Sequence, residues 1–304
     1  KAAGVKHGDT VITPNYTCVS NLSCISQCNA KPIIVEIEKD TLGLDFKLVK
    51  KAVEKYKPKV LQIVHVYGFP ARDTLKIIKL CKKKKILVIE DSSEAFGSEI
   101  KNKKIGTFGD INVTSIRSEK MIGVGEGGIL SFSNQSLYKK ALLVSSRHAP
   151  YRGGKDPYWK KYFVNGEGYN YLMPHLLGAV ARAQVERFPK FMLRKKIQIG
   201  NYYKKIFKDK RIRLTQKNIK NHKSVFWLNS IYFNFLPKKQ VFKIGKELMK
   251  LGVEIRSGFW PLNRQNGFKF KYINSIGNKK NKVSSDILSK SLVLPSSVDL
   301  KLQD

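Results

Sequence analysis

The chain has 304 residues, of which 42% are hydrophobic, so a large core is possible and wholesale disorder is disfavoured. Its 58 Lys and Arg residues against 23 Asp and Glu residues give a net charge of +35. No apolar run is long enough to span a bilayer, and no membrane partner is expected. The lysines are scattered over expected helix ends and loops, which favours a solvated surface over a nucleic-acid interface.

The four cysteines do not form a metal-binding pattern. Cys24 and Cys28 could share one face of a helix, but no second Cys/His pair completes a zinc site. No metal is therefore expected. Buried, reduced cysteines in a cytoplasmic protein are the favoured interpretation.

The first part of the sequence alternates short apolar runs with helical spacing. The expected strands are Asp9–Pro14, Pro32–Ile37, Val60–Val66 and Ile86–Ile89. Between them, the patterns predict helices over Cys18–Cys28, Phe46–Tyr56 and Thr74–Lys84, the last capped by Asp73. This alternation predicts an α/β fold, with a mostly parallel sheet sandwiched by helices.

The later elements follow a different pattern. Further strands are predicted at Asn112–Ile116, Ile129–Phe132 and around Val144, and one long helix from Pro174 to about Lys196. Beyond it, a helix over Gln240–Leu251 lies between expected strands at Ser224–Phe235 and Val253–Ile255. We therefore expect a large domain over residues 1–200 and a smaller α+β domain over residues 201–304.

The segment from Val88 to Leu130 holds the residues that could carry chemistry. Ligands of parallel sheets bind at the carboxyl ends of strands, where Asp91 and Ser115 are expected. Lys120 follows in the spacing Ser-x-x-x-x-Lys, before a Gly-Glu-Gly-Gly turn. A pyridoxal enzyme needs an acid at the ring nitrogen, a reactive lysine, and hydroxyl and N–H groups for the phosphate. Taken singly, Asp91 could be a strand-end cap or an ion-pair partner, Lys120 would be a surface lysine, and the Gly-Glu-Gly-Gly run could be an ordinary hairpin turn.

Taken together and in order, these motifs resemble the DegT/DnrJ/EryC1/StrS sugar aminotransferases, fold type I enzymes that use pyridoxal phosphate. The likeness rests on Glu-Asp-x-x-x-Ala-x-Gly from Glu90, Gly-Thr-Phe-Gly-Asp at Gly106–Asp110, the Ser-to-Lys spacing and the Gly-Glu-Gly-Gly turn. Tyr158-Trp159 and the segment around Trp260 lean toward the perosamine-synthase-like branch. The family's N-terminal helices would precede Lys1, so the resemblance suggests an N-terminally truncated chain.

The resemblance implies a role for each candidate residue. Lys120 would be the catalytic Schiff-base lysine and proton shuttle, Asp91 the partner of the pyridine nitrogen, and Ser115 a phosphate ligand. By the same resemblance, Glu94 would lie beside the cofactor ring, at a position where the family usually has Gln or His. Asn170, within Gly-Tyr-Asn-Tyr, would serve the site of a neighbouring subunit, which implies a homodimer with a shared active site.

The implied reaction moves an amino group from glutamate to a nucleotide-linked keto-deoxysugar, giving a 4-amino sugar such as perosamine. One alternative is a sugar dehydratase of the same family, although those enzymes carry His where Lys120 stands. The other is a non-catalytic regulatory or nucleic-acid-binding role, which has no need of the lysine, the carboxylate and the serine together.

Overall fold

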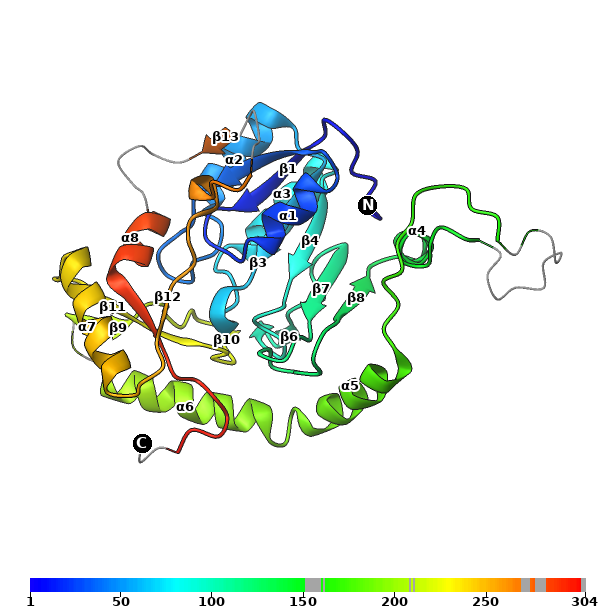
Figure 1. Ribbon diagram of the computed structural model, residues 1–304. Helices are drawn as coiled ribbons and strands as arrows, with labels where there is room; N and C mark the ends of the chain where they lie inside the picture. Colours follow the sequence, from blue (N-terminus) through cyan, green and yellow to red (C-terminus); the bar gives the residue numbers. More distant parts are fainter. Residues whose placement is uncertain are drawn as a thin grey trace.

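A large, mostly parallel sheet forms the centre of the molecule (Figure 1). The computed structural model describes residues 1–150, 160, 162–207, 209, 211–268, 274–276 and 283–301. Within these residues the neighbouring strands of the large sheet are, in order, β13 (Asn274–Ile276), β2 (Lys31–Val35), β1 (Thr10–Pro14), β3 (Val60–Val64), β4 (Leu87–Asp91), β7 (Ile111–Ser115) and β8 (Gly128–Phe132). All of these pairings are parallel except that of β8, which runs antiparallel to β7.

Helices cover both faces of this sheet, as the alternating pattern predicted. On one face lie α2 (Phe46–Tyr56) and α3 (Thr74–Lys84), and on the other lie α1 (Ser20–Ser26) and α4 (Gln135–Ser145). Successive residues of β1 serve the two faces: Val11 belongs to the core under α1, and Ile12 to the core under α2 and α3. The strands therefore read as continuous apolar runs because they are buried on both sides.

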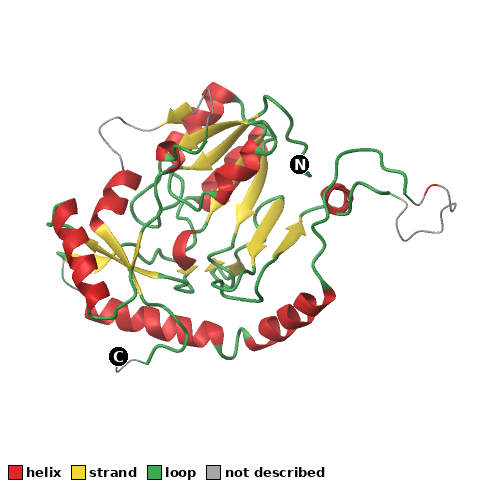
Figure 2. Cartoon of the chain, in the orientation of Figure 1, coloured by secondary structure: helices red, strands yellow, loops and turns green. Residues whose placement is uncertain are grey.

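A second, antiparallel sheet lies beside the first, with strands β12 (Arg256–Ser257), β14 (Ser291–Leu294), β11 (Asn229–Phe233) and β9 (Ile212–Leu214) in that order. It packs with α7 (Lys238–Lys250) and α8 (Val283–Lys290). A small third sheet joins β10 (His222–Lys223) to β5 (Glu99–Ile100) and β6 (Lys103–Lys104). Figure 2 shows the strands in yellow and the helices around them in red.

Two consecutive helices form an arc along one side of the molecule, α5 (His175–Arg187) and α6 (Met192–Ile206) (Figure 1). A single helix from Pro174 to Lys196 was predicted, and that prediction is wrong. Pro189 has no N–H to donate and its ring collides with the preceding turn, so the chain breaks between the two helices.

Other predictions differ from the structure in detail. Val144 lies in α4, not in a strand, and Val253–Ile255 precedes β12 without joining it. Asp73 makes no capping hydrogen bond to α3, because its carboxylate pairs with Arg72 at 2.9 Å and Lys76 at 3.0 Å. All four cysteines are free, but only Cys81 is buried.

The strand predicted over Ser224–Phe235 is shorter in the structure, because β11 covers only Asn229–Phe233. Phe226 has a left-handed backbone with φ of 53°, which interrupts extended structure. The bounds of α2 and α3 are as predicted. Among the described helices, none is long and apolar enough to cross a membrane.

Candidate active site

The carboxyl ends of β3, β4 and β7 meet at one edge of the large sheet. Asp91 ends β4, where it is paired with Val64 of β3 and with Val113 of β7. Ser115 ends β7, and the chain then loops through Lys120 before returning as β8. The predicted carboxylate, hydroxyl and amine therefore belong to the same edge of the sheet, where ligands of such folds bind.

The carboxylate of Asp91 is held in one orientation by two hydrogen bonds. Its Oδ2 accepts from the Asn21 side-chain amide at 3.0 Å, and its Oδ1 accepts from the Ser93 N–H at 2.9 Å. Asn21 is buried in α1 and also donates to the Thr17 hydroxyl at 3.0 Å. The sequence analysis did not single out Asn21, because one polar residue within a predicted helix carries no motif that distinguishes it.

Lys120 lies between a carboxylate and an aromatic ring. Its Nζ is 3.6 Å from Glu94 Oε1 and 3.9 Å from the centre of the Trp227 ring. The side chain of Lys120 is only 11% exposed, so both contacts are largely shielded from water. Trp227, far away in sequence, carried no motif and was missed by the sequence analysis.

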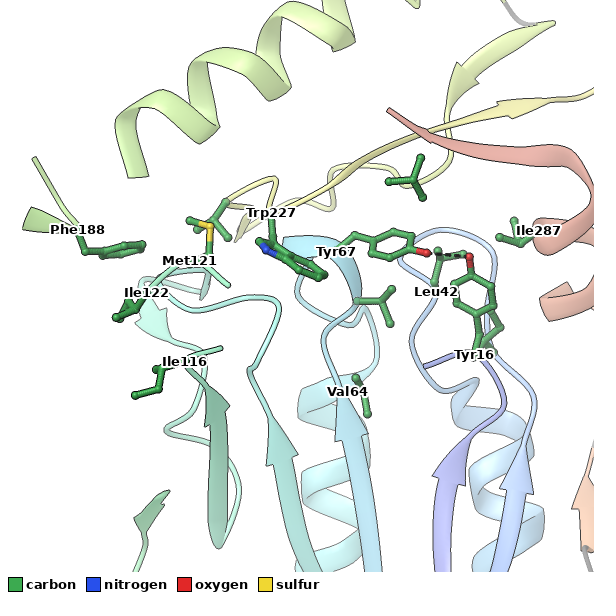
Figure 3. Close-up of a cluster of buried hydrophobic side chains, with 14 of the residues drawn as sticks. Tyr16, Leu42, Val64, Tyr67, Ile116, Met121, Ile122, Phe188, Trp227 and Ile287 are labelled. Atoms are coloured by element: carbon green, nitrogen blue, oxygen red, sulfur yellow. Dashed lines mark hydrogen bonds between the residues drawn. The ribbon is translucent and has the colours of Figure 1, made fainter. Parts of the chain in front are cut away.

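Glu94 is buried and fixed by the backbone of a strained turn. Its second oxygen, Oε2, accepts the Tyr67 N–H at 2.9 Å. Tyr67 has a left-handed backbone with φ of 56°, a conformation that costs free energy in a non-glycine residue. Figure 3 shows the Tyr67 ring beside Tyr16, whose hydroxyl lies 3.2 Å from its own. These ring contacts hold the turn that aims the N–H at Glu94.

Burial raises the pKa of Glu94 to about 7, and the negative charge of Asp91 adds to this effect, while Lys120 and the Tyr67 N–H oppose it. Glu94 thus interacts electrostatically with both Asp91 and Lys120, which ties the three groups to one site. A carboxyl that titrates near neutral pH can accept or return a proton at its Oε1, close to the lysine amine.

The raised pKa of Glu94 predicts a pH-dependent stability. In the unfolded chain this carboxyl loses its proton near 4.5, whereas in the folded chain it keeps the proton up to about 7. The folded state therefore binds more protons in this window, and the free energy of unfolding falls as pH rises through it. We expect the free energy of unfolding, measured with urea, to fall between pH 5 and pH 8. This fall should be about 2 kcal/mol smaller in Glu94→Gln than in the wild type. An identical fall in the variant would contradict the prediction.

Ser115 and Asn170 occupy different positions relative to this edge. The Ser115 N–H donates to the Ser93 hydroxyl at 3.0 Å, and its own Oγ accepts from the Arg117 N–H at 3.4 Å. Asn170 is exposed and forms an isolated β-bridge with Ser146, next to α4. Within the described chain no hydrogen bond or ion pair joins Asn170 to Asp91, Glu94 or Lys120. Its predicted role in a neighbouring subunit stays a prediction.

The donor set fits pyridoxal phosphate. An oriented carboxylate, a shielded primary amine with a proton-exchanging neighbour and a strand-end hydroxyl are the groups this cofactor requires. The described residues contain no group of three or more His, Cys, Asp or Glu side chains able to hold a metal ion. The reactive groups that the site does contain are the Lys120 amine and the Asp91 and Glu94 carboxylates.

The chain belongs to the DegT/DnrJ/EryC1/StrS aminotransferase family, whose model matches residues 1–304. It is accordingly an enzyme of the pyridoxal-phosphate-dependent sugar aminotransferase class, as the motifs suggested. It is 30% identical over 295 residues to a GDP-perosamine synthase of Escherichia coli O157:H7, a match that covers 97% of this chain and 76% of that protein. A second GDP-perosamine synthase, from Vibrio cholerae, is 31% identical over 265 residues, covering 86% of this chain and 68% of the relative.

Solved structures confirm the predicted fold type I architecture. The aminotransferase TlmJ from Streptoalloteichus hindustanus superposes with a TM-score of 0.85 at 22% identity, covering 99% of this chain and 77% of that one. A GDP-4-keto-6-deoxymannose-3-dehydratase variant with bound GDP-perosamine superposes with a TM-score of 0.84, also at 22% identity, covering 98% and 78%. At these identities the likeness concerns the fold alone. Tyr158 and Trp159, part of the perosamine-like pattern, lie outside the described residues.

Proposed function

We propose that this enzyme transfers the amino group of glutamate to the 4-keto carbon of a GDP-linked 6-deoxy sugar, forming a 4-amino sugar such as perosamine. The observation that carries the proposal is the position of the Lys120 amine, 3.6 Å from Glu94 at the strand edge that also holds Asp91. The GDP-perosamine synthases among its relatives support the choice of nucleotide and sugar.

Each residue has a defined task in this proposal. Pyridoxal phosphate, when bound, supplies the carbonyl that carries the amino group and the ring that takes up electrons. Asp91, oriented by Asn21, holds a proton at the ring nitrogen, and the Ser115 hydroxyl binds phosphate. Lys120 Nζ holds the cofactor covalently at rest and moves a proton at the reacting carbon once released. Glu94 Oε1 lies beside that amine and can take up or return its proton.

A second copy of the chain completes the site in this proposal. Asn170 is exposed, and the surface near it carries apolar side chains that include Tyr171 at 66% exposure and Leu172 at 52%. Exposed apolar side chains clustered in this way are typical of protein interfaces. We infer a homodimer, acting in the cytoplasm, in which Asn170 of each chain reaches the cofactor site of the other.

The sugar dehydratase is the second candidate, because one solved structure of the same fold is such an enzyme. Dehydration leaves the sugar without a new amino group, whereas transamination adds one. Lys120 favours transamination, since a lysine is needed to regenerate the resting enzyme. A nucleic-acid-binding role has the net charge of +35 as its only support.

An assay with a panel of substrates tests the proposal. The enzyme, with pyridoxal phosphate and glutamate, is given GDP-, UDP- and dTDP-linked 4-keto-6-deoxy sugars, and the products are weighed by mass spectrometry. We expect amination of the GDP-linked sugar together with formation of 2-oxoglutarate. Glutamine in place of glutamate tests the donor. A product that has lost water without gaining nitrogen would instead identify a dehydratase, and turnover of only UDP- or dTDP-linked sugars would refute the GDP assignment.

A further inference from the structure

The indole of Trp227 contacts two consecutive residues of the loop that carries the reactive amine. Its ring centre lies 3.9 Å from Lys120 Nζ, and its Nε1–H donates to the Glu119 carbonyl at 2.8 Å. The side chain is buried, with 6% of its surface exposed. Figure 3 shows the indole between Met121 and Tyr67, above the strand ends. Trp227 thus holds both the backbone and the amine of this loop.

The backbone of Trp227 is itself anchored by a buried lysine. Lys196 of α6 donates from Nζ to the Trp227 carbonyl at 2.8 Å and also to the Ser296 carbonyl. Only 7% of Lys196 is exposed, and this burial lowers its pKa to about 8. At neutral pH the amine is therefore still mostly charged, and such charge-assisted bonds are stronger than neutral ones. Burying the Lys196 ammonium group costs free energy, which its hydrogen bonds to these two carbonyls offset in part.

Close packing fixes the same segment from two sides. A Cβ on Gly200 of α6 would lie 2.2 Å from the Phe226 ring, and a Cβ on Gly68 would lie 2.5 Å from the Trp227 N. Neither glycine could carry a side chain without moving residues 226 and 227. The left-handed backbone of Phe226, with φ of 53°, turns the chain between these two contacts. The position of the indole is therefore determined by α6 and by the turn at Gly68.

We propose that Trp227 is a positioning residue that holds the free amine of Lys120 between its ring face and Glu94, and that Lys196 fixes Trp227 in place. The proposal rests on Lys120 being the reactive lysine of the proposed function. A lysine released from the cofactor is long and flexible, and it must remain close to the reacting carbon to move a proton. The aromatic face of Trp227 and the carboxylate of Glu94 together limit the positions that the Lys120 amine can take.

Chemical labelling of the protein freed of cofactor tests this contact without any assay of turnover. Acetylation with an N-hydroxysuccinimide ester is followed by mass spectrometry, and the rate at Lys120 is divided by the rate at exposed Lys51. In Trp227→Leu we expect this ratio to rise about fivefold, because the amine loses the ring that shields and holds it. Trp227→Phe, which keeps a ring face, should stay within about twofold of wild type.

Lys196→Met provides an independent variant that leaves the indole in the sequence. If Lys196 fixes Trp227, the labelling ratio of Lys120 rises in this variant as well. After pyridoxal phosphate is added, the absorbance of lysine-bound cofactor should also return more slowly than in the wild type. An unchanged Lys120 ratio in Trp227→Leu, with far-ultraviolet circular dichroism as in wild type, would overturn the proposal. Should Trp227→Leu not fold, an unchanged ratio in Lys196→Met has the same meaning.

The two proposals can fail separately. A wild-type protein that forms no lysine-bound cofactor at position 120 contradicts the proposed function. A wild-type protein that forms it, but whose Lys120 labelling is the same in all three variants, contradicts only the role of Trp227.

Discussion

Lys120→Ala is expected to reduce amino transfer by at least about 10³-fold, because one side chain supplies both the covalent attachment and the proton carrier. The absorbance of lysine-bound cofactor should disappear with it. The measurements are the rate of amination of the GDP-linked keto sugar and the visible spectrum after addition of pyridoxal phosphate. Lys51→Ala, at an exposed position of α2, is the matched control and should keep both signals. A Lys120→Ala protein with an unchanged spectrum would refute the assignment.

The same variant tests whether the site is shared between subunits. If Asn170 serves the neighbouring subunit, a mixture of Lys120→Ala and Asn170→Ala chains assembles some sites with an intact lysine and an intact asparagine. Unfolding and refolding the two inactive proteins together should then restore measurable activity. A mixture that is no more active than its two components would place Asn170 in the site of its own chain or outside any site.

Glu90→Ala is expected to destabilise the fold by about 3–5 kcal/mol, the range typical of a removed partner in a buried polar network. The Glu90 carboxylate accepts three backbone N–H groups at 2.8 Å, from Gly106, Phe108 and Gly109, and lies 3.2 Å from His65 Nε2. Burial alone would raise the pKa of Glu90, but the His65 bond and these N–H groups outweigh it and hold that pKa below its ordinary value. Alanine leaves all of these donors without an acceptor.

Urea unfolding at pH 7 measures this loss. Glu186→Ala is the control, since Glu186 is 63% exposed and its ion pair among the described residues is with Arg182 one turn away, an interaction of about 0.5 kcal/mol or less. Glu90→Gln should fall between the control and alanine, because its single carbonyl oxygen can replace only part of the carboxylate. A loss below about 1 kcal/mol in Glu90→Ala would show that the loop finds other acceptors.

This network explains why two of the recognition motifs occur together. Glu-Asp at the end of β4 and Gly-Thr-Phe-Gly-Asp at Gly106–Asp110 were read from the sequence as a family signature. In the structure the first motif supplies the acceptor and the second supplies the donors, while Asp110 Oδ2 accepts the Val88 N–H at 2.8 Å. Adjacent side chains of β4 point to opposite faces of the sheet. Glu90 therefore binds the backbone of the loop at Gly106–Asp110, while Asp91 faces the site.

The spacing of apolar residues along the sequence predicted the helices that have a clear amphipathic pattern. The helices at Phe46–Tyr56 and Thr74–Lys84 carry clear amphipathic spacing and were predicted to the residue. The break at Pro189 was not predicted, although a proline inside a helical pattern ends or kinks a helix. Val144 was mistaken for strand because β-branched and aliphatic residues in a short run suit either structure.

The parts of the site that depend on distant packing could not be predicted. Trp227 reaches Lys120 only because α6, the turn at Gly68 and the Phe226 backbone together aim it there. Asn21 reaches Asp91 because α1 lies over the sheet at that point. No motif or period in the sequence encodes either contact, since each is made between elements that are remote along the chain.

The reversal of β8 constrains the reactive loop in a further way. Ser115 is paired with Gly128, so the segment that carries Lys120 leaves the sheet and rejoins it at neighbouring positions. An insertion or deletion between Ser115 and Lys120 would shift the amine even if the pairing of the two strands were preserved. The number of residues between Ser115 and Lys120 is therefore constrained by the need to place the Lys120 amine at the site.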